Sequence, residues 1–144
     1  MALIVDHLRK EEGTVLHAYQ DHLGYWTIGV GRLIDAKKGG GISEAEAEYL
    51  LMNDIAKVQL QLDDRIPWWR GLSEVRQCVL VSMAFQMGIG GLMSFKNTLG
   101  AIERGDWARA AAGMRASKWH TQTPARAGRL AAAMETDEVE ALKL

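Results

Sequence analysis

The sequence predicts an α+β fold with a small β-lobe, a connecting helix and a larger helical lobe. Three observations favour this fold class. Residues 15–34 show the period-two alternation of strands, whereas residues 43–64 show a helical period. Beyond Pro67 every apolar pattern has helical spacing. At 144 residues we expect one domain with two lobes and a ligand-binding cleft between them.

The first element is a short amphipathic helix over residues 3–12, on which Leu3 and Leu8 share one face. Gly13 suits the end of this helix, because glycine adopts the left-handed conformation without penalty. Glu12 then lies in the last turn, where the helix dipole disfavours a negative charge. A carboxylate at this position needs a cationic partner or a reason to be partly protonated.

A β-hairpin follows, with strands over 15–21 and 25–31 around a glycine-containing turn. A short third strand is predicted at 33–34, and a flexible loop at 37–41. A capping box at 43–46 then begins the connecting helix.

The register of the hairpin places Tyr19 opposite Thr27, so Asp21 and Thr27 project from the same face. Gly29 and Gly31 continue that face without side chains and leave a trough for a flat sugar ring. The opposite face carries residues that suit a core: Trp26, Ile28 and Val30.

The rest of the chain is predicted to be helical. Five residues are the expected N-caps of its helices: Ser73, Ser94, Asp106, Thr123 and Thr136. A glycine-rich break is expected at 87–91. We expect the single domain 1–144 to have three parts: a β-lobe at 14–42, a connecting helix at 43–64, and a helical lobe made of 65–144 together with 1–12.

Composition argues against several functional classes. The net charge of −1 does not favour nucleic-acid binding. The apolar run before Asp6 is too short for a secretory signal, and no stretch approaches the roughly 20 apolar residues of a membrane span. The histidines show no paired metal-ligand spacing, so no metal site is predicted. Cys78 is followed by apolar residues and is expected to be a buried thiol.

Charge is unevenly distributed along the chain. Basic side chains predominate in residues 101–130, which include Arg104 and Arg109. This pattern fits a basic surface that attracts an anionic polymer, but it also fits ordinary solvated helix faces.

Glu12 and Asp21 are the candidates for glycoside hydrolysis. That reaction needs a carboxylic acid to protonate the leaving oxygen, and a second group to manage water or the developing cation. On spacing alone, such a set is more often a group of solvated turn and cap residues.

Specific motifs strengthen this interpretation. Three of them resemble the catalytic signature of the T-even type phage lysozymes, glycoside hydrolase family 24: Glu12-Gly13, Tyr19-Gln-Asp21 and Gly24-Tyr-Trp-Thr27-Ile-Gly-Val-Gly31. The likeness continues, in order, through Asp54 and residues 76–80, 85–88, 95–99, 117–119 and 122–127. The resemblance implies a lysozyme-like fold and hydrolysis of bacterial peptidoglycan.

The resemblance also implies roles for the three central residues. Glu12 would be a buried general acid, and Thr27 would hold a water on the opposite face of the sugar. Asp21 would either stabilise the cationic sugar or help to activate that water. The family inverts at the anomeric carbon, which calls for carboxyl groups about 6.5–9.5 Å apart.

Other positions carry over from the family. Arg126 would pair with Glu12, and Gln86 would line the cleft. Leu33, Phe85 and Thr98 match substrate-contacting positions, although Phe85 fits a plain core residue equally well.

The chain departs from the family pattern at three places. Arg32 stands in place of a histidine, and we predict that it pairs with Asp54. Gly113 replaces a polar sugar-contacting residue, which leaves that subsite open. The loop at 36–41 is shorter than in larger members.

No cofactor is implied, because a carboxylic acid and water suffice for the reaction. The resemblance suggests a monomer made in the host cytoplasm, released through a phage holin and acting on periplasmic peptidoglycan, without a membrane anchor. A lytic transglycosylase is the main alternative enzyme, but it needs no water-positioning Asp21 and Thr27. A non-catalytic glycan-binding or phage structural module is the alternative from another class.

Overall fold

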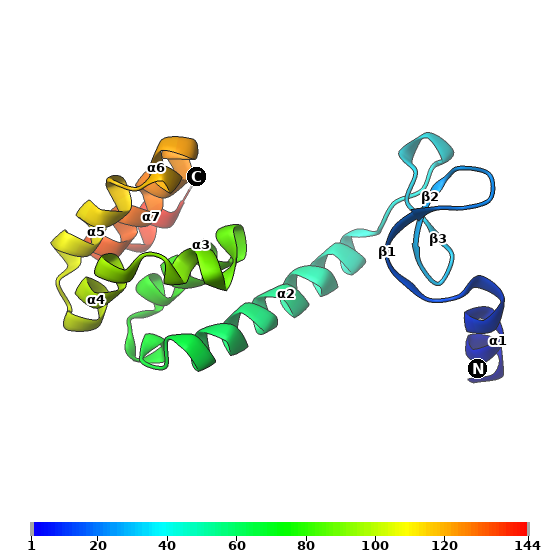
Figure 1. Ribbon diagram of the computed structural model, residues 1–144, viewed down its shortest axis with the longest axis horizontal. Helices are drawn as coiled ribbons and strands as arrows, with labels where there is room; N and C mark the ends of the chain where they lie inside the picture. Colours follow the sequence, from blue (N-terminus) through cyan, green and yellow to red (C-terminus); the bar gives the residue numbers. More distant parts are fainter. Residues whose placement is uncertain (1, 144) are drawn as a thin grey trace. The chain divides into compact units, whose positions relative to one another are not determined.

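The computed structural model describes residues 2–143, and the chain divides into two compact units, 1–50 and 51–144 (Figure 1). The first unit contains α1 (Ala2–Glu12), β1 (Val15–Gln20), β2 (Trp26–Gly29), β3 (Arg32–Leu33) and the 3-10 turn η1 (Ala36–Lys38). The helix α2 (Glu44–Arg65) begins in the first unit and continues into the second. Helices with one small sheet confirm the predicted α+β class.

The remaining elements belong to the second unit. They are η2 (Trp69–Gly71), α3 (Glu74–Met93), α4 (Lys96–Arg104), α5 (Trp107–Arg115), α6 (Lys118–Gln122), α7 (Pro124–Thr136) and η3 (Val139–Leu142). The predicted association of residues 1–12 with the helical lobe stays a prediction.

The sheet of the first unit is antiparallel, with the strand order β1-β2-β3. Thr27 lies on the central strand, opposite Tyr19 on one side and Leu33 on the other. The predicted register is therefore confirmed, although an irregularity between Val15 and Tyr19 pairs Val15 with Gly29. Among the described residues of this unit only Thr27 is buried.

Two residues that we assigned to a core of the first unit are exposed instead. Trp26 is 46% exposed and Val30 is 39% exposed. A sheet of three short strands is too small to bury a layer of apolar side chains on its second face. The alternation of polar and apolar residues therefore identified the strands correctly but did not indicate a buried layer.

Local hydrogen bonds set the end of α1 and the start of α2. Gly13 has a φ of +74°, and its N–H donates to the carbonyl of Arg9 at 2.9 Å, which ends α1 as predicted. At the start of α2 the N–H of Glu46 donates to Oγ of Ser43 at 3.1 Å, and the N–H of Ser43 donates to Oε1 of Glu46 at 2.9 Å. This reciprocal pair confirms the capping box.

The loop before α2 is more regular than predicted. Asp35 caps η1 by accepting a hydrogen bond from the N–H of Lys37 at 2.9 Å. The N–H of Gly41 donates to the carbonyl of Leu33 at 3.1 Å, so the loop returns to β3. A Cβ on Gly40 would lie 2.6 Å from that same carbonyl oxygen, which explains a glycine there.

The hydrophobic core lies in the second unit, where α3 to α7 pack together (Figure 1). Its largest fully buried side chains include Leu62, Trp69, Leu80, Met83, Ile102, Met114 and Met134. By length and composition, α3 is the one helix of residues 2–143 that is apolar enough to cross a membrane. It is the core helix here, since seven of its residues are buried.

Four predictions about this unit were wrong in detail. Thr136 is the last residue of α7, and Glu138 rather than Thr136 is the cap of η3. The break at 87–91 is a kink at Gly88 (φ 78°, ψ 162°), after which α3 resumes. Ser94 ends α3 rather than capping α4, because its hydroxyl donates to the carbonyl of Gly91 at 2.6 Å. Cys78 is exposed. The apolar neighbours Val79 and Leu80 are the buried ones, and a helix turns Cys78 away from their face.

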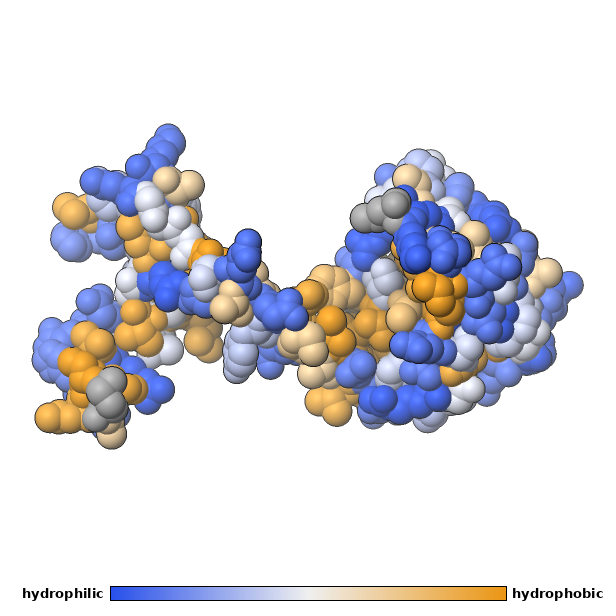
Figure 2. Space-filling model, turned by 180° about the vertical axis from the view of Figure 1, so that it is seen from behind, coloured by the Kyte–Doolittle hydropathy of each residue, from blue (hydrophilic) through white to orange (hydrophobic). Residues whose placement is uncertain are grey.

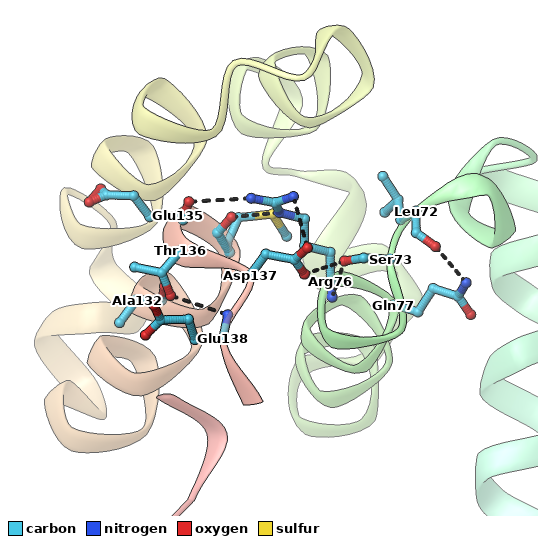
Figure 3. Close-up of polar contacts among 10 residues, drawn as sticks. Leu72, Ser73, Arg76, Gln77, Ala132, Glu135, Thr136, Asp137 and Glu138 are labelled. Carbon is cyan, nitrogen blue, oxygen red and sulfur yellow. Dashed lines mark hydrogen bonds and ion pairs between the residues drawn. The ribbon is translucent and has the colours of Figure 1, made fainter. Parts of the chain in front are cut away.

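The end of α7 is joined to the start of α3 through Arg76 (Figure 3). This side chain is only 10% exposed, and its Nε donates to the carbonyl of Met134 at 2.8 Å. Its guanidinium lies 3.6 Å from Asp137 and stacks over the ring of Trp107 at 3.7 Å. Ser73 donates to the other carboxylate oxygen of Asp137. The buried cation thus holds both helix ends with its charge compensated.

Candidate active site

Glu12 ends α1 with its carboxyl group against the backbone of Gly31. A Cβ added to Gly31 would lie 2.7 Å from Oε2 of Glu12 and 2.8 Å from its Cδ. Gly31 also has a φ of +68°, which L side chains rarely adopt. Glycine at position 31 therefore serves two purposes: it permits the turn after β2 and it leaves room for the carboxyl group.

Glu12 itself is exposed. The resemblance led us to expect a buried acid, and within the first unit the side chain is not enclosed. Its pairing with Arg126 concerns residues of different units and stays a prediction.

Asp21 holds the hairpin turn together. Its Oδ1 accepts two hydrogen bonds, from the N–H of Tyr25 and the N–H of Leu23, each at 2.9 Å. These amides, Tyr25 first, lower the pKa of Asp21 below its ordinary value, because they stabilise the charged form. Asp21 is consequently a fixed anion at neutral pH.

Thr27 is 5% exposed, and its hydroxyl donates to the carbonyl of Tyr25 at 3.0 Å. The proton of this hydroxyl is thereby committed, so Oγ1 can only accept a further hydrogen bond. The backbone of Tyr25 thus joins the two residues, because its N–H fixes Asp21 and its carbonyl fixes Thr27. The sequence did not point to Tyr25, since the connection uses only main-chain atoms.

Arg32 has a different partner from the one predicted. Its Nη1 lies 2.6 Å from Oε2 of Glu46, so the acid found is Glu46 rather than Asp54. The Arg32 guanidinium, followed by the N–H and hydroxyl of Ser43, lowers the pKa of Glu46 to about 2. The capping box already holds Glu46 at the start of α2, whereas Asp54 is two turns further along and lies in the second unit.

The other predicted site residues are divided between the units. Leu33 is half-buried on β3 opposite Thr27, in the first unit. In the second unit Oε1 of Gln86 accepts a hydrogen bond from the indole of Trp119 at 2.9 Å. Nη2 of Arg126 donates to Oγ of Ser82 at 3.1 Å.

Phe85 is 44% exposed, so the alternative of a core residue is wrong. It lines an apolar pocket of about 500 Å³ in the second unit, together with Leu51, Ile55, Cys78 and Val81. Figure 2 shows apolar side chains gathered around the part of this unit that α2 enters. Because Cys78 lines this open pocket, its thiol is exposed rather than buried.

Thr98 is 6% exposed and faces Gly113 on the neighbouring helix. A Cβ on Gly113 would overlap Oγ1 of Thr98. Glycine at position 113 therefore leaves the space that the Thr98 side chain occupies.

The first unit contains an acid that lies against Gly31, and a fixed carboxylate and an accepting hydroxyl that are joined by the backbone of Tyr25. These are the groups that glycoside hydrolysis requires.

Comparison with known proteins points the same way. Residues 9–135 match the family model described as phage lysozyme. A probable T4-type lysozyme of Dictyostelium discoideum is 31% identical, and the match covers 97% of this chain and 98% of that protein. The pre-baseplate central spike protein Gp5 of Enterobacteria phage T4 is 33% identical over 95% of this chain, which corresponds to 28% of that protein. An endolysin of Acyrthosiphon pisum secondary endosymbiont phage 1 is 30% identical over 73% of this chain and 70% of its own length.

Proposed function

This chain belongs to the phage lysozyme family and is a peptidoglycan-hydrolysing glycosidase, and we propose that it is an endolysin. Its reaction is cleavage of the β-1,4 bond between N-acetylmuramic acid and N-acetylglucosamine, with inversion at the anomeric carbon. The observation that supports these roles most directly is the joint fixation of Asp21 and Thr27 by the backbone of Tyr25, in the same unit as Glu12.

Glu12 acts as the general acid. In its protonated form it donates a proton to the glycosidic oxygen as the bond to the anomeric carbon breaks. Gly31 supports this role because it lets the carboxyl group approach the strand backbone, where a side chain would displace it.

Asp21 acts as an electrostatic stabiliser rather than as the main base. A carboxylate whose pKa is lowered by two amide donors is a weak proton acceptor, and it carries its charge at neutral pH. Its position is held by the turn, so little reorganisation is needed when positive charge develops on the sugar.

Thr27 orients the attacking water. Because its own proton is donated to the carbonyl of Tyr25, Oγ1 accepts a hydrogen bond from the water and leaves a water lone pair for the anomeric carbon. Attack from the side opposite Glu12 inverts the configuration. As the new bond to the anomeric carbon forms, the attacking water releases a proton to solvent, and Glu12 regains from solvent the proton that it gave to the leaving oxygen. The reaction therefore requires no cofactor.

The products test this proposal against its nearest alternative. Hydrolysis adds water and yields a reducing N-acetylmuramic acid end, whereas a lytic transglycosylase forms a 1,6-anhydro sugar. We expect mass spectrometry of digested peptidoglycan to find reducing ends, and NMR at early times to find the α-anomer that inversion produces. Anhydro ends would refute hydrolysis, and an initial β-anomer would refute inversion alone.

The biological setting is part of the proposal. The enzyme is made in the host cytoplasm as a monomer, leaves through a phage holin and acts on periplasmic peptidoglycan to lyse the cell. Expression with and without a holin tests this directly, since lysis should require the holin. The match to a section of a baseplate spike protein favours a second setting, as a hydrolase carried on the phage particle. Detection of the chain in purified virions would support that second setting.

A further inference from the structure

Lys38, in the loop after β3, contacts the turn that carries Asp21. Its Nζ lies 4.7 Å from the centroid of the Tyr25 ring, within the range of a cation–π contact. Within residues 2–143 this lysine forms no ion pair, so its charge is not engaged elsewhere. The ring of Tyr25 is thus held by a residue from outside the hairpin.

The backbone of the loop leaves Lys38 little freedom. Lys38 is the last residue of η1, and its N–H donates to the carbonyl of Asp35 at 3.1 Å. The N–H of Gly40 donates to the same carbonyl at 2.9 Å. The carboxylate of Asp35 accepts from the N–H of Lys37 in addition. Only the lysine side chain therefore has to be ordered for its contact with the ring to form.

Hydrogen bonds hold the turn at residues 21–25 within its own hairpin. In the part of the chain that the structure describes, the hydrogen bonds of this turn all go to residues 20–27. These bonds determine the shape of the turn, but they do not tie it to the rest of the first unit. The contact between Lys38 and Tyr25 connects the turn to the loop, and the loop is anchored on β3 through the carbonyl of Leu33.

Tyr25 is the residue through which Lys38 reaches the site. The N–H of Tyr25 donates to Oδ1 of Asp21, and its carbonyl accepts the proton of Thr27. Restraining the ring also restrains the Cα to which it is attached, so both hydrogen bonds fluctuate less. Groups that are held in place before the reaction need less reorganisation when charge develops on the sugar.

We propose that Lys38 is a positioning residue for glycan hydrolysis, which acts through the ring of Tyr25 on Asp21 and Thr27. The inference rests on the proposed function, because that function gives Asp21 and Thr27 their roles. In this role Lys38 contacts no sugar and takes no part in the bond changes. Its loss should therefore lower kcat rather than raise KM.

Initial rates of reducing-end release from soluble peptidoglycan fragments test this role. Lys38→Met keeps the length of the side chain and removes its charge. We expect kcat to fall about two- to fivefold, as for the loss of a cation–π contact at an exposed site, with KM nearly unchanged. Lys38→Arg keeps a cation over the ring and should restore kcat. Lys38→Met should add little to the effect of Tyr25→Leu, which already removes the ring.

Lys37→Met is the matched control, because it removes one exposed charge from the adjacent position of the same loop. If Lys38 attracted the polymer by its charge, both lysine variants would raise KM to a similar extent, and the proposal would be refuted. Equal losses of kcat in the two variants would refute it too. So would a Lys38→Arg variant that is as slow as Lys38→Met.

Hydrogen exchange of the Tyr25 amide reports on the contact without catalysis. We expect this N–H, which donates to Asp21, to exchange about two- to fivefold faster in Lys38→Met and at an unchanged rate in Lys37→Met. Unchanged exchange in Lys38→Met, or faster exchange without a loss of kcat, would refute the proposal. Release of reducing ends by the unmodified enzyme tests the proposed function separately, so either idea can fail without the other.

Discussion

Gly31→Ala tests whether the backbone after β2 positions the catalytic acid. The substitution has two effects. Alanine is strained at a φ of +68°, which costs about 1–2 kcal/mol of folding free energy. Its Cβ would also lie 2.7 Å from Oε2 of Glu12, where ordinary contacts are 3.4–4 Å. The carboxyl group must therefore move by several tenths of an ångström.

A displacement on this scale affects the rate more than the fold. A misplacement of about 1 Å costs roughly 100-fold in rate, so a shift of several tenths of an ångström should cost about tenfold, equivalent to about 1.4 kcal/mol of transition-state stabilisation. We expect Gly31→Ala to fold, to unfold at a somewhat lower temperature, and to lose about tenfold in kcat with a smaller change in KM. Release of reducing ends from purified peptidoglycan measures the rate, and thermal unfolding measures stability.

Gly39→Ala is the matched control for backbone strain. Gly39 has a φ of +77°, and a Cβ there would meet nothing within 4 Å. This variant should share the stability loss of Gly31→Ala and keep its activity. If the two variants hydrolyse peptidoglycan at the same rate, the contact between Gly31 and Glu12 does not position the acid and the reasoning is refuted.

Three further predictions concern charge and packing. Arg76→Met should lower the free energy of unfolding by about 3 kcal/mol, because a buried charged hydrogen-bond network is lost. A change below about 1 kcal/mol, measured by chemical denaturation, would contradict the role of this network. The pKa of Glu46 is lowered to about 2, so its contribution to stability is complete above pH 4.5 and is lost as the pH falls through 2. Glu46→Gln should therefore flatten the dependence of the unfolding free energy on pH across that interval. An unchanged slope would refute the ion pair with Arg32. Gly113→Ala should destabilise the protein by about 1–3 kcal/mol, because the added Cβ overlaps Thr98. Adding Thr98→Ala should recover most of that loss. Simple additivity of the two effects in the double-mutant cycle would contradict the contact.

The sequence was most informative where one local interaction determines the structure. The glycine-containing turn set the register that places Asp21 and Thr27, and the Ser43–Glu46 capping box set the start of α2. Gly13 likewise marked the end of α1. In each case the partners are separated by a few residues, so spacing alone is sufficient.

Sequence reasoning failed where two choices look alike along the chain. Glu46 and Asp54 are eight residues apart on one helix, so both were open to Arg32 until the fold of the preceding loop was known. Cys78 lies in an apolar run on a helix with buried residues around much of its circumference, and composition does not reveal which side meets the pocket. The approach of Glu12 to Gly31 spans nineteen positions and left no local signal.

The central claim is that Glu12 is the general acid, and Glu12→Gln measured beside Glu11→Gln tests it most directly. Both glutamates are exposed at the end of α1, so the two variants lose the same charge from adjacent positions. We predict that the initial rate of reducing-end release from purified peptidoglycan falls by about 10²–10⁴-fold in Glu12→Gln and stays near the unmodified rate in Glu11→Gln. Equal rates in the two variants would contradict the assignment of the acid.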